Sequence, residues 1–126
     1  MLSAITVCGE AIPLMLGRGG GSIILSGATA SLRGGKAFAP FASAKFALRG
    51  LAGSLAREFQ PQGVHVSHVV LDGVLWTERS RERFPDLERV RAIEPDVVAE
   101  VYWNLAHQSA SAWTHEIDLR PRSETF

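Results

Sequence analysis

Segments with helical spacing alternate with short apolar segments along this chain, and this alternation is the feature that most constrains its fold. Apolar residues recur every three or four positions over 2–16 and 41–60, and Pro95 opens a third such segment. Between and after them lie short strand-like stretches at 22–26, 64–71 and 114–119. The order helix, strand, helix, strand, helix, strand is typical of βαβ units. We therefore expect an α/β fold in which helices cover a parallel sheet, with the strand at 22–26 buried on both faces.

Composition limits the partners and the compartment. The chain of 126 residues carries 13 Lys and Arg against 13 Asp and Glu, a balance that argues against a nucleic-acid partner. It is long enough for a single domain over residues 1–126. The lone Cys8 excludes an internal disulfide and a Cys-rich zinc site, and the spacing of the four histidines predicts no metal site.

The apolar start of the chain predicts a buried helix. Glu10 interrupts the apolar run and no basic residue precedes it, which argues against a signal peptide. No apolar run reaches the roughly 18 residues of a membrane span. We expect no membrane partner and a cytoplasmic location.

A glycine run at 17–21 invites comparison with a phosphate-binding loop. Such a loop follows a strand and opens a helix, so that the N–H groups of the helix face the phosphate. Here the run closes a helix and precedes a strand. We therefore interpret it as a helix-to-strand turn.

Several motifs together resemble one known family. Residues 21–31 read Gly-Ser-Ile-Ile-Leu-Ser-Gly-Ala-Thr-Ala-Ser, and Phe-Ala-Ser-Ala-Lys, Ser-Leu-Ala-Arg-Glu and Gly-Val-His-Val follow at 41–45, 54–58 and 63–66. Over nearly the whole chain the sequence closely resembles the C-terminal half of a short-chain dehydrogenase/reductase. The resemblance implies the C-terminal half of a Rossmann-type doubly wound parallel sheet, lacking the N-terminal phosphate-binding half. It also implies NAD or NADP as cofactor and hydride transfer to or from a small-molecule carbonyl or alcohol.

The resemblance places the family's catalytic groups on unusual residues. The family uses a Tyr-x-x-x-Lys pair, and here Phe41, which has no exchangeable proton, stands at the tyrosine position before Lys45. Lys45 is implied to contact the nicotinamide ribose; the alternative is a solvated helix lysine. Ala28 stands where the family has a serine, and Thr29 is the candidate substitute. The alternative is that Thr29 and its neighbouring hydroxyls only satisfy backbone groups of the loop.

A second group of candidates follows the strand at 64–71. The resemblance implies that Asp72, Gly73 and Thr77 contact the nicotinamide carboxamide, with an ordinary turn as the alternative. His68 and Asp72 fall near the carboxyl end of this strand, where parallel sheets bind ligands. Either could replace the missing proton donor; the alternative for His68 is a structural histidine. The resemblance also implies that the choice of substrate depends on the segment 77–94.

Two functions remain open at this point. The first is an NAD(P)-dependent oxidoreductase with altered acid and base groups. The second is a non-catalytic relative or inactive fragment that acts through the helices at 2–16 and 41–60, by which the family usually dimerises, so we expect a homo-oligomer. We also expect a truncated gene product, an isoform or a partial gene model, in which the flank of strand 22–26 is exposed.

Overall fold

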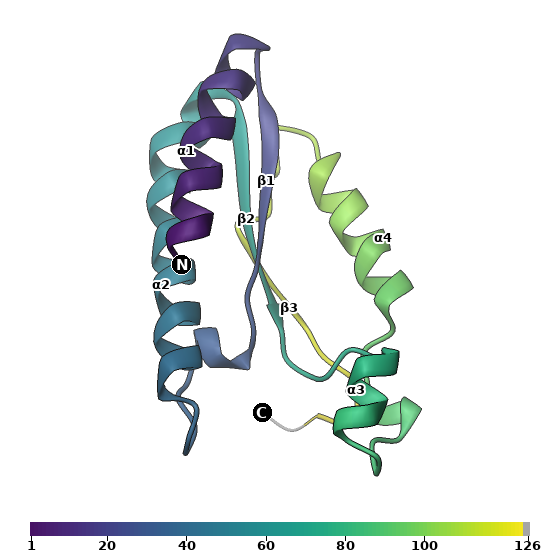
Figure 1. Cartoon of the computed structure of the whole chain (residues 1–126). Coiled ribbons are helices and arrows are strands. Elements are labelled where there is room, and N and C mark those ends of the chain that lie inside the picture. Colours follow the sequence, from purple (N-terminus) through teal and green to yellow (C-terminus); the bar gives the residue numbers. More distant parts are fainter. Residues whose placement is uncertain (125–126) are drawn as a thin grey trace.

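The computed structural model describes residues 1–124 and has a three-stranded parallel sheet with helices on both faces (Figure 1). The strands are β1 (Gly21–Ser26), β2 (Val64–Leu71) and β3 (Glu116–Leu119), in the spatial order β1-β2-β3. Both pairs are parallel, with Ile23 opposite Val66 and Val69 opposite Ile117. The expected α/β class and the order of its elements are confirmed.

Two long helices cover one face of the sheet. They are α1 (Leu2–Gly17) and α2 (Ala39–Phe59), and the core beneath them is formed by a small set of buried residues. These are Cys8, Ile12, Ile23, Ala56, Val64 and Val66. In α2 the most buried positions are the alanines at 42, 52 and 56, whereas Leu48, Leu51 and Leu55 are only half-buried. Small side chains allow the helix axis to lie close to the sheet, and the leucines then flank the contact.

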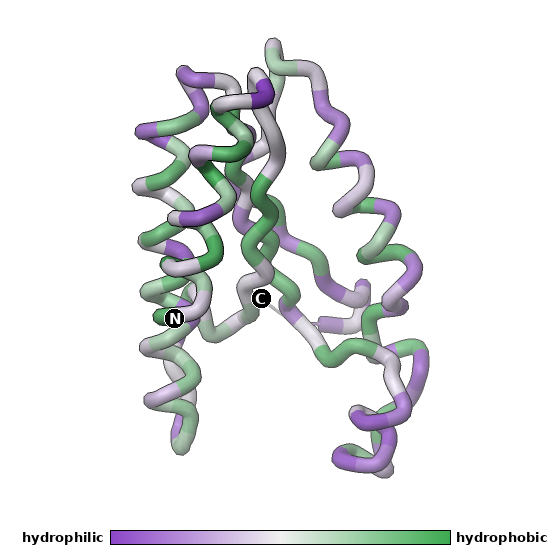
Figure 2. Tube along the Cα trace, turned by 45° about the horizontal axis from the view of Figure 1, so that its top comes forward, coloured by the Kyte–Doolittle hydropathy of each residue, from purple (hydrophilic) through white to green (hydrophobic). Residues whose placement is uncertain are grey.

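The other face carries α4 (Pro95–Ala106), which packs through Val98 and Leu105. The short helix α3 (Glu78–Arg83) and the single turns η1 (Thr29–Ser31), η2 (Gln60–Gln62) and η3 (Arg89–Arg91) lie in the connections. Figure 2 shows the apolar stretches gathered along the strands in the middle of the molecule. Within residues 1–124, no helix is both long and apolar enough to cross a membrane.

The expectation that the first strand is buried on both faces was wrong. β2, in the centre of the sheet, has seven consecutive buried residues, whereas in β1 only Ile23 is buried. The difference follows from the strand order, because β1 pairs with β2 on one side and forms the edge of the sheet on the other.

The glycine run joins α1 to β1, as expected of a helix-to-strand turn. Gly19 and Gly20 have φ values of 86° and 142°, which glycine adopts most readily. A Cβ on Gly20 would lie 2.6 Å from the carbonyl oxygen of Gly63, so two loops meet here at the amino end of the sheet. This is the end opposite to the one at which parallel sheets bind ligands.

Candidate functional site

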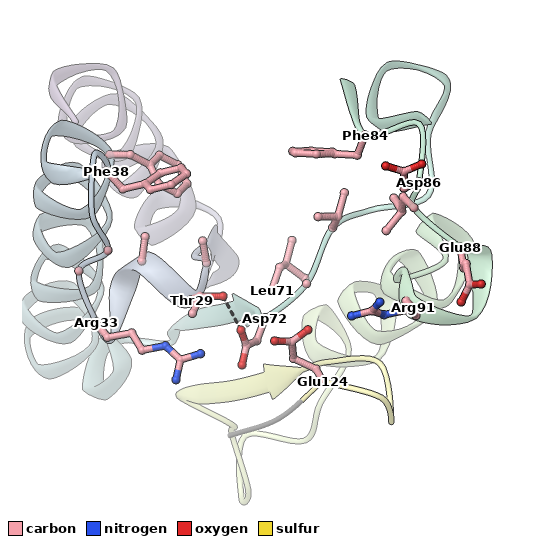
Figure 3. Close-up of a pocket in the computed structure, with 18 residues that line it drawn as sticks. Thr29, Arg33, Phe38, Leu71, Asp72, Phe84, Asp86, Glu88, Arg91 and Glu124 are labelled. Carbon is pink, nitrogen blue, oxygen red and sulfur yellow. Dashed lines mark hydrogen bonds between the residues drawn. The ribbon is translucent and has the colours of Figure 1, made fainter. Parts of the chain in front are cut away.

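A cavity of about 680 Å³ lies at the carboxyl end of β2 (Figure 3). Its walls come from four parts of the chain: the loop between β1 and α2 with the start of α2, the end of β2, residues 84–91, and Glu124 after β3. The lining residues with polar or aromatic side chains are Thr29, Arg33, Phe38, Phe41, Asp72, Phe84, Asp86, Glu88, Arg91 and Glu124. A volume of this size is typical of small-molecule sites.

Thr29 and Asp72 meet at one side of the cavity. The Thr29 hydroxyl, in η1, donates a hydrogen bond to Oδ1 of Asp72, which follows β2 (Figure 3). Asp72 is 5% exposed, and Nη1 of Arg120 lies 3.3 Å from its Oδ2. The guanidinium compensates the charge of this buried carboxylate. Because the hydroxyl proton of Thr29 is directed to Asp72, the lone pairs of its oxygen are available to accept a further hydrogen bond.

Phe41 contributes an apolar wall. It lies in the first turn of α2, is 46% exposed and stacks edge-to-face with Phe38 at a centroid distance of 6.4 Å. Ala28 lines the same cavity. Neither side chain offers a proton, so the polar side chains on this side of the cavity are those of Thr29, Arg33 and Asp72.

Lys45 lies one turn further along α2 and does not line the cavity. Its Nζ donates to the carbonyl oxygen of Ser26 at 2.8 Å and lies 5.8 Å from the centroid of the Phe41 ring. Burial lowers the pKa of this ammonium from its ordinary value. An ammonium has three N–H donors, and the bond to Ser26 occupies one of them.

Of the two other candidates that follow β2, Gly73 lines the cavity and Thr77 does not. Gly73 lines the cavity beside Asp72, and a Cβ there would lie 2.9 Å from Cδ of Pro121, so close packing requires glycine. Thr77 is not among the lining residues. Its hydroxyl caps α3 by accepting a hydrogen bond from the Ser80 N–H at 3.1 Å.

His68 is buried beneath α2 rather than facing the cavity. Its Nδ1 lies 2.9 Å from Oε2 of Glu116, and Arg49 binds the same carboxylate through Nε and Nη2, each at 2.7 Å. Burial lowers the pKa of His68, although the Glu116 carboxylate acts in the opposite direction. The bond from Arg49 lowers the pKa of Glu116.

Sequence reasoning anticipated two sides of the cavity and missed two of its charged lining residues, Arg33 and Glu124. The segment 77–94, on which the choice of substrate is expected to depend, forms a wall through residues 84, 86–88 and 91. Arg33 and Glu124 carried no recognisable pattern, and the pairing of Arg49 with Glu116 spans 67 residues. Residues so far apart leave no spacing signal in one sequence. Within residues 1–124, no three His, Cys, Asp or Glu side chains are placed to hold a metal ion.

Comparisons with known proteins agree with the fold. A family model described as short chain dehydrogenase matches residues 1–88. A short-chain dehydrogenase structure from Rhodopseudomonas palustris is 45% identical, with a TM-score of 0.69 over 89% of this chain and 43% of that chain. The closed form of a serine dehydrogenase complexed with NADP+ is 18% identical, with a TM-score of 0.84 over 97% of this chain and 52% of that one.

Similarity to curated proteins is more distant. The mouse (Mus musculus) protein named dehydrogenase/reductase SDR family member 4 is 29% identical over 109 residues, which are 79% of this chain and 39% of that protein. The chain thus spans about two fifths of the length of the curated relatives that it matches.

Proposed function

The chain belongs to the short chain dehydrogenase family, and we propose that it carries the substrate side of an NAD- or NADP-dependent oxidoreductase acting on a small-molecule alcohol or carbonyl compound. The observation that carries the proposal is the pairing of Thr29 with Asp72 at the cavity. This cavity lies at the carboxyl end of a parallel sheet, where open α/β folds bind their ligands.

The residues around the cavity suit the nicotinamide end of such a cofactor. A nicotinamide ring is flat and largely apolar, with one amide that needs hydrogen-bond partners. Phe38 and Phe41 supply aromatic surface, and the backbone of Gly73 supplies peptide groups. Lys45 would hold the ribose with the N–H donors that Ser26 leaves unused. Bound NAD or NADP supplies hydride acceptance in one direction of the reaction and hydride donation in the other.

In this proposal the chain's own residues handle the proton. During oxidation of an alcohol, the substrate hydroxyl donates its proton to Oγ1 of Thr29, whose own proton passes to the Asp72 carboxylate along the existing hydrogen bond. The C–H hydrogen leaves as hydride, so the substrate loses two electrons and becomes a carbonyl compound. During reduction the proton returns by the same route. The guanidinium of Arg120 lies beside the carboxylate of Asp72, with Nη1 3.3 Å from Oδ2.

Substitution of the two polar residues tests this function. Oxidation of a panel of secondary alcohols is followed through formation of NADH or NADPH. We expect Thr29→Val to lower kcat by about 100-fold, as loss of a positioned proton-transfer group does, and Asp72→Asn to act similarly. Thr6→Val is the matched control, because that hydroxyl binds only the Leu2 carbonyl on the exposed side of α1.

Two results would contradict the proposal. A Thr29→Val variant as active as the parent chain would remove the hydroxyl from the mechanism. A parent chain that binds neither cofactor and oxidises no alcohol would remove the enzyme function itself. Phe41→Tyr adds a further comparison: a gain in carbonyl reduction would mean that the missing phenol limits the rate.

A second proposed function is self-association through α1 and α2. The outer side of α1 exposes Leu2, Val7 and Leu14 at 82%, 65% and 64%, and α2 exposes Phe46. Exposed apolar groups along adjacent helices are typical of an interface between subunits. Sedimentation equilibrium tests it: we expect a homodimer that Leu14→Glu dissociates, and a parent chain that is monomeric would contradict it. We also propose a reducing, cytoplasmic location, which suits the free thiol of buried Cys8.

A further inference from the structure

His68 has the largest side chain among the fully buried residues, and one edge of its imidazole is hydrogen-bonded through Nδ1 to Glu116. His68 shares with Val64 and Val66 the face of β2 that α2 covers. Glu116 accepts a hydrogen bond from Nδ1, and the bidentate contact with Arg49 fixes that carboxylate in turn. The carboxylate and the guanidinium are 30% and 44% exposed, so the network leads from the surface to a wholly buried ring.

The opposite edge of the ring lies against the turn between β1 and η1. A Cβ built on Gly27 would lie 2.3 Å from Nε2 of His68 and 2.8 Å from Oγ of Ser31. The imidazole therefore occupies the space that any side chain at residue 27 would need. Two further bonds define the turn: the Gly27 N–H donates to the Val69 carbonyl at 2.7 Å, and the Ala28 N–H donates to Oγ of Ser31 at 3.1 Å.

His68 and Ser31 both lie against Gly27, and no hydrogen bond joins their side chains in the described residues 1–124. Since the carboxylate of Glu116 takes the proton of Nδ1, the hydrogen-bond network assigns Nε2 as a bare acceptor. Within residues 1–124 this buried atom has no hydrogen-bond partner. Ser31 is fully buried beside the same glycine, and its hydroxyl carries a proton.

We propose that His68 is a positioning residue for the alcohol and carbonyl chemistry proposed above, and this inference rests on that function. Clamped by Glu116 and Arg49, the imidazole sets the turn at residues 27–31 and thereby the place of the Thr29 hydroxyl. Asp72 follows the same strand that carries His68. β2 therefore positions both members of the proton-transfer pair, Asp72 directly and Thr29 through the ring of His68.

Hydrogen exchange in variants of the whole chain tests the structural half of the inference. His68→Ala removes the ring. Glu116→Ala keeps the ring but removes the carboxylate that orients it, at a side chain that is 30% exposed. We expect amide exchange in residues 27–31 to rise about tenfold in His68→Ala and by a smaller factor in Glu116→Ala, with α4 unchanged. His65→Ala is the matched control, because His65 is an equally buried histidine of β2 that binds the Thr114 carbonyl instead. It should leave the turn unaffected.

Kinetic measurements test the catalytic half of the inference, the effect of His68 on alcohol oxidation. For an alcohol that the parent chain oxidises with NAD or NADP, we expect His68→Ala to lower kcat by about tenfold while KM changes by less than about twofold. Unchanged exchange at residues 27–31, or a rise equal to that of α4, would overturn the positioning role, as would an unchanged kcat. If His68→Ala does not fold, Glu116→Ala decides by the same criteria. Absence of alcohol oxidation in the parent chain would defeat the proposed function, and the exchange experiment would still decide whether His68 sets the turn.

Discussion

Substitution of Gly27 by alanine probes the contact between the turn and the buried imidazole. The new methyl carbon would lie 2.3, 2.7 and 2.8 Å from Nε2 and Cε1 of His68 and from Oγ of Ser31. Carbon contacts in proteins are optimal at about 3.5–4.0 Å. The ring cannot retreat without losing its bond to Glu116. Overpacking of a core costs about 1–3 kcal/mol, and loss of a hydrogen bond to a charged group adds about 1.5 kcal/mol, so we expect Gly27→Ala to destabilise the chain by about 2.5–4.5 kcal/mol.

A double-mutant cycle with His68→Ala separates this contact from other effects. Without the ring, only the contact with the rotatable Ser31 hydroxyl remains. The lower entropy of an unfolded alanine also favours folding by about 0.4–1 kcal/mol. We therefore expect Gly27→Ala to cost less than about 1 kcal/mol in the His68→Ala background, which is a coupling energy of about 2 kcal/mol.

Urea unfolding, followed by circular dichroism and tryptophan fluorescence, measures the four free energies of the cycle. Gly50→Ala in α2 is the control, because a Cβ there meets nothing within 4 Å. We expect it to be neutral or to stabilise the helix by about 1 kcal/mol. Equal costs of Gly27→Ala in the two backgrounds would refute the argument that the imidazole fills the space beside residue 27.

Three further predictions concern Lys45, His68 and Cys8. Lys45→Ala should weaken NAD or NADP binding about tenfold by calorimetry, whereas Lys36→Ala on the exposed loop should not; equal affinities would remove Lys45 from the cofactor site. Burial lowers the pKa of His68 from 6.5, so the unfolded chain binds this proton more tightly and the free energy of unfolding should fall as pH drops below about 6.5. His68→Asn should flatten that part of the stability profile, and an unchanged profile would assign the dependence to other groups. Burial raises the pKa of the Cys8 thiol, so iodoacetamide should modify it slowly in the folded chain and rapidly in urea; equal rates would mean that α1 opens readily.

The order of elements could be predicted because local patterns carry it. The β-branched run at 64–71 gave β2 its observed bounds, and the glycine run was correctly interpreted as the turn between α1 and β1. Burial was harder to predict, because it depends on the neighbours of each element. β1 and β2 are both short apolar runs, and only the strand order makes β2 central and β1 an edge.

In the candidate site, too, the sequence indicated individual residues, whereas the structure showed which of them are in contact. The resemblance pointed to Thr29, Phe41, Asp72 and Gly73, and all four line one cavity. Lys45 and Thr77 are engaged nearby, with the Ser26 carbonyl and with the cap of α3. Their roles with a cofactor stay predictions. Thr29 is hydrogen-bonded to Asp72, and no pattern in the sequence predicted that these two residues would be partners.

The sequence by itself determined the class of fold and the family to which the chain belongs. These follow from periodicity and from short motifs, which are local properties of a chain. The tertiary structure decided which side chains meet: Thr29 with Asp72, Arg49 with Glu116, and His68 with the turn at Gly27. The reason is physical. Contacts between residues far apart in sequence depend on strand order and on the depth at which each helix packs, and a single sequence does not specify either.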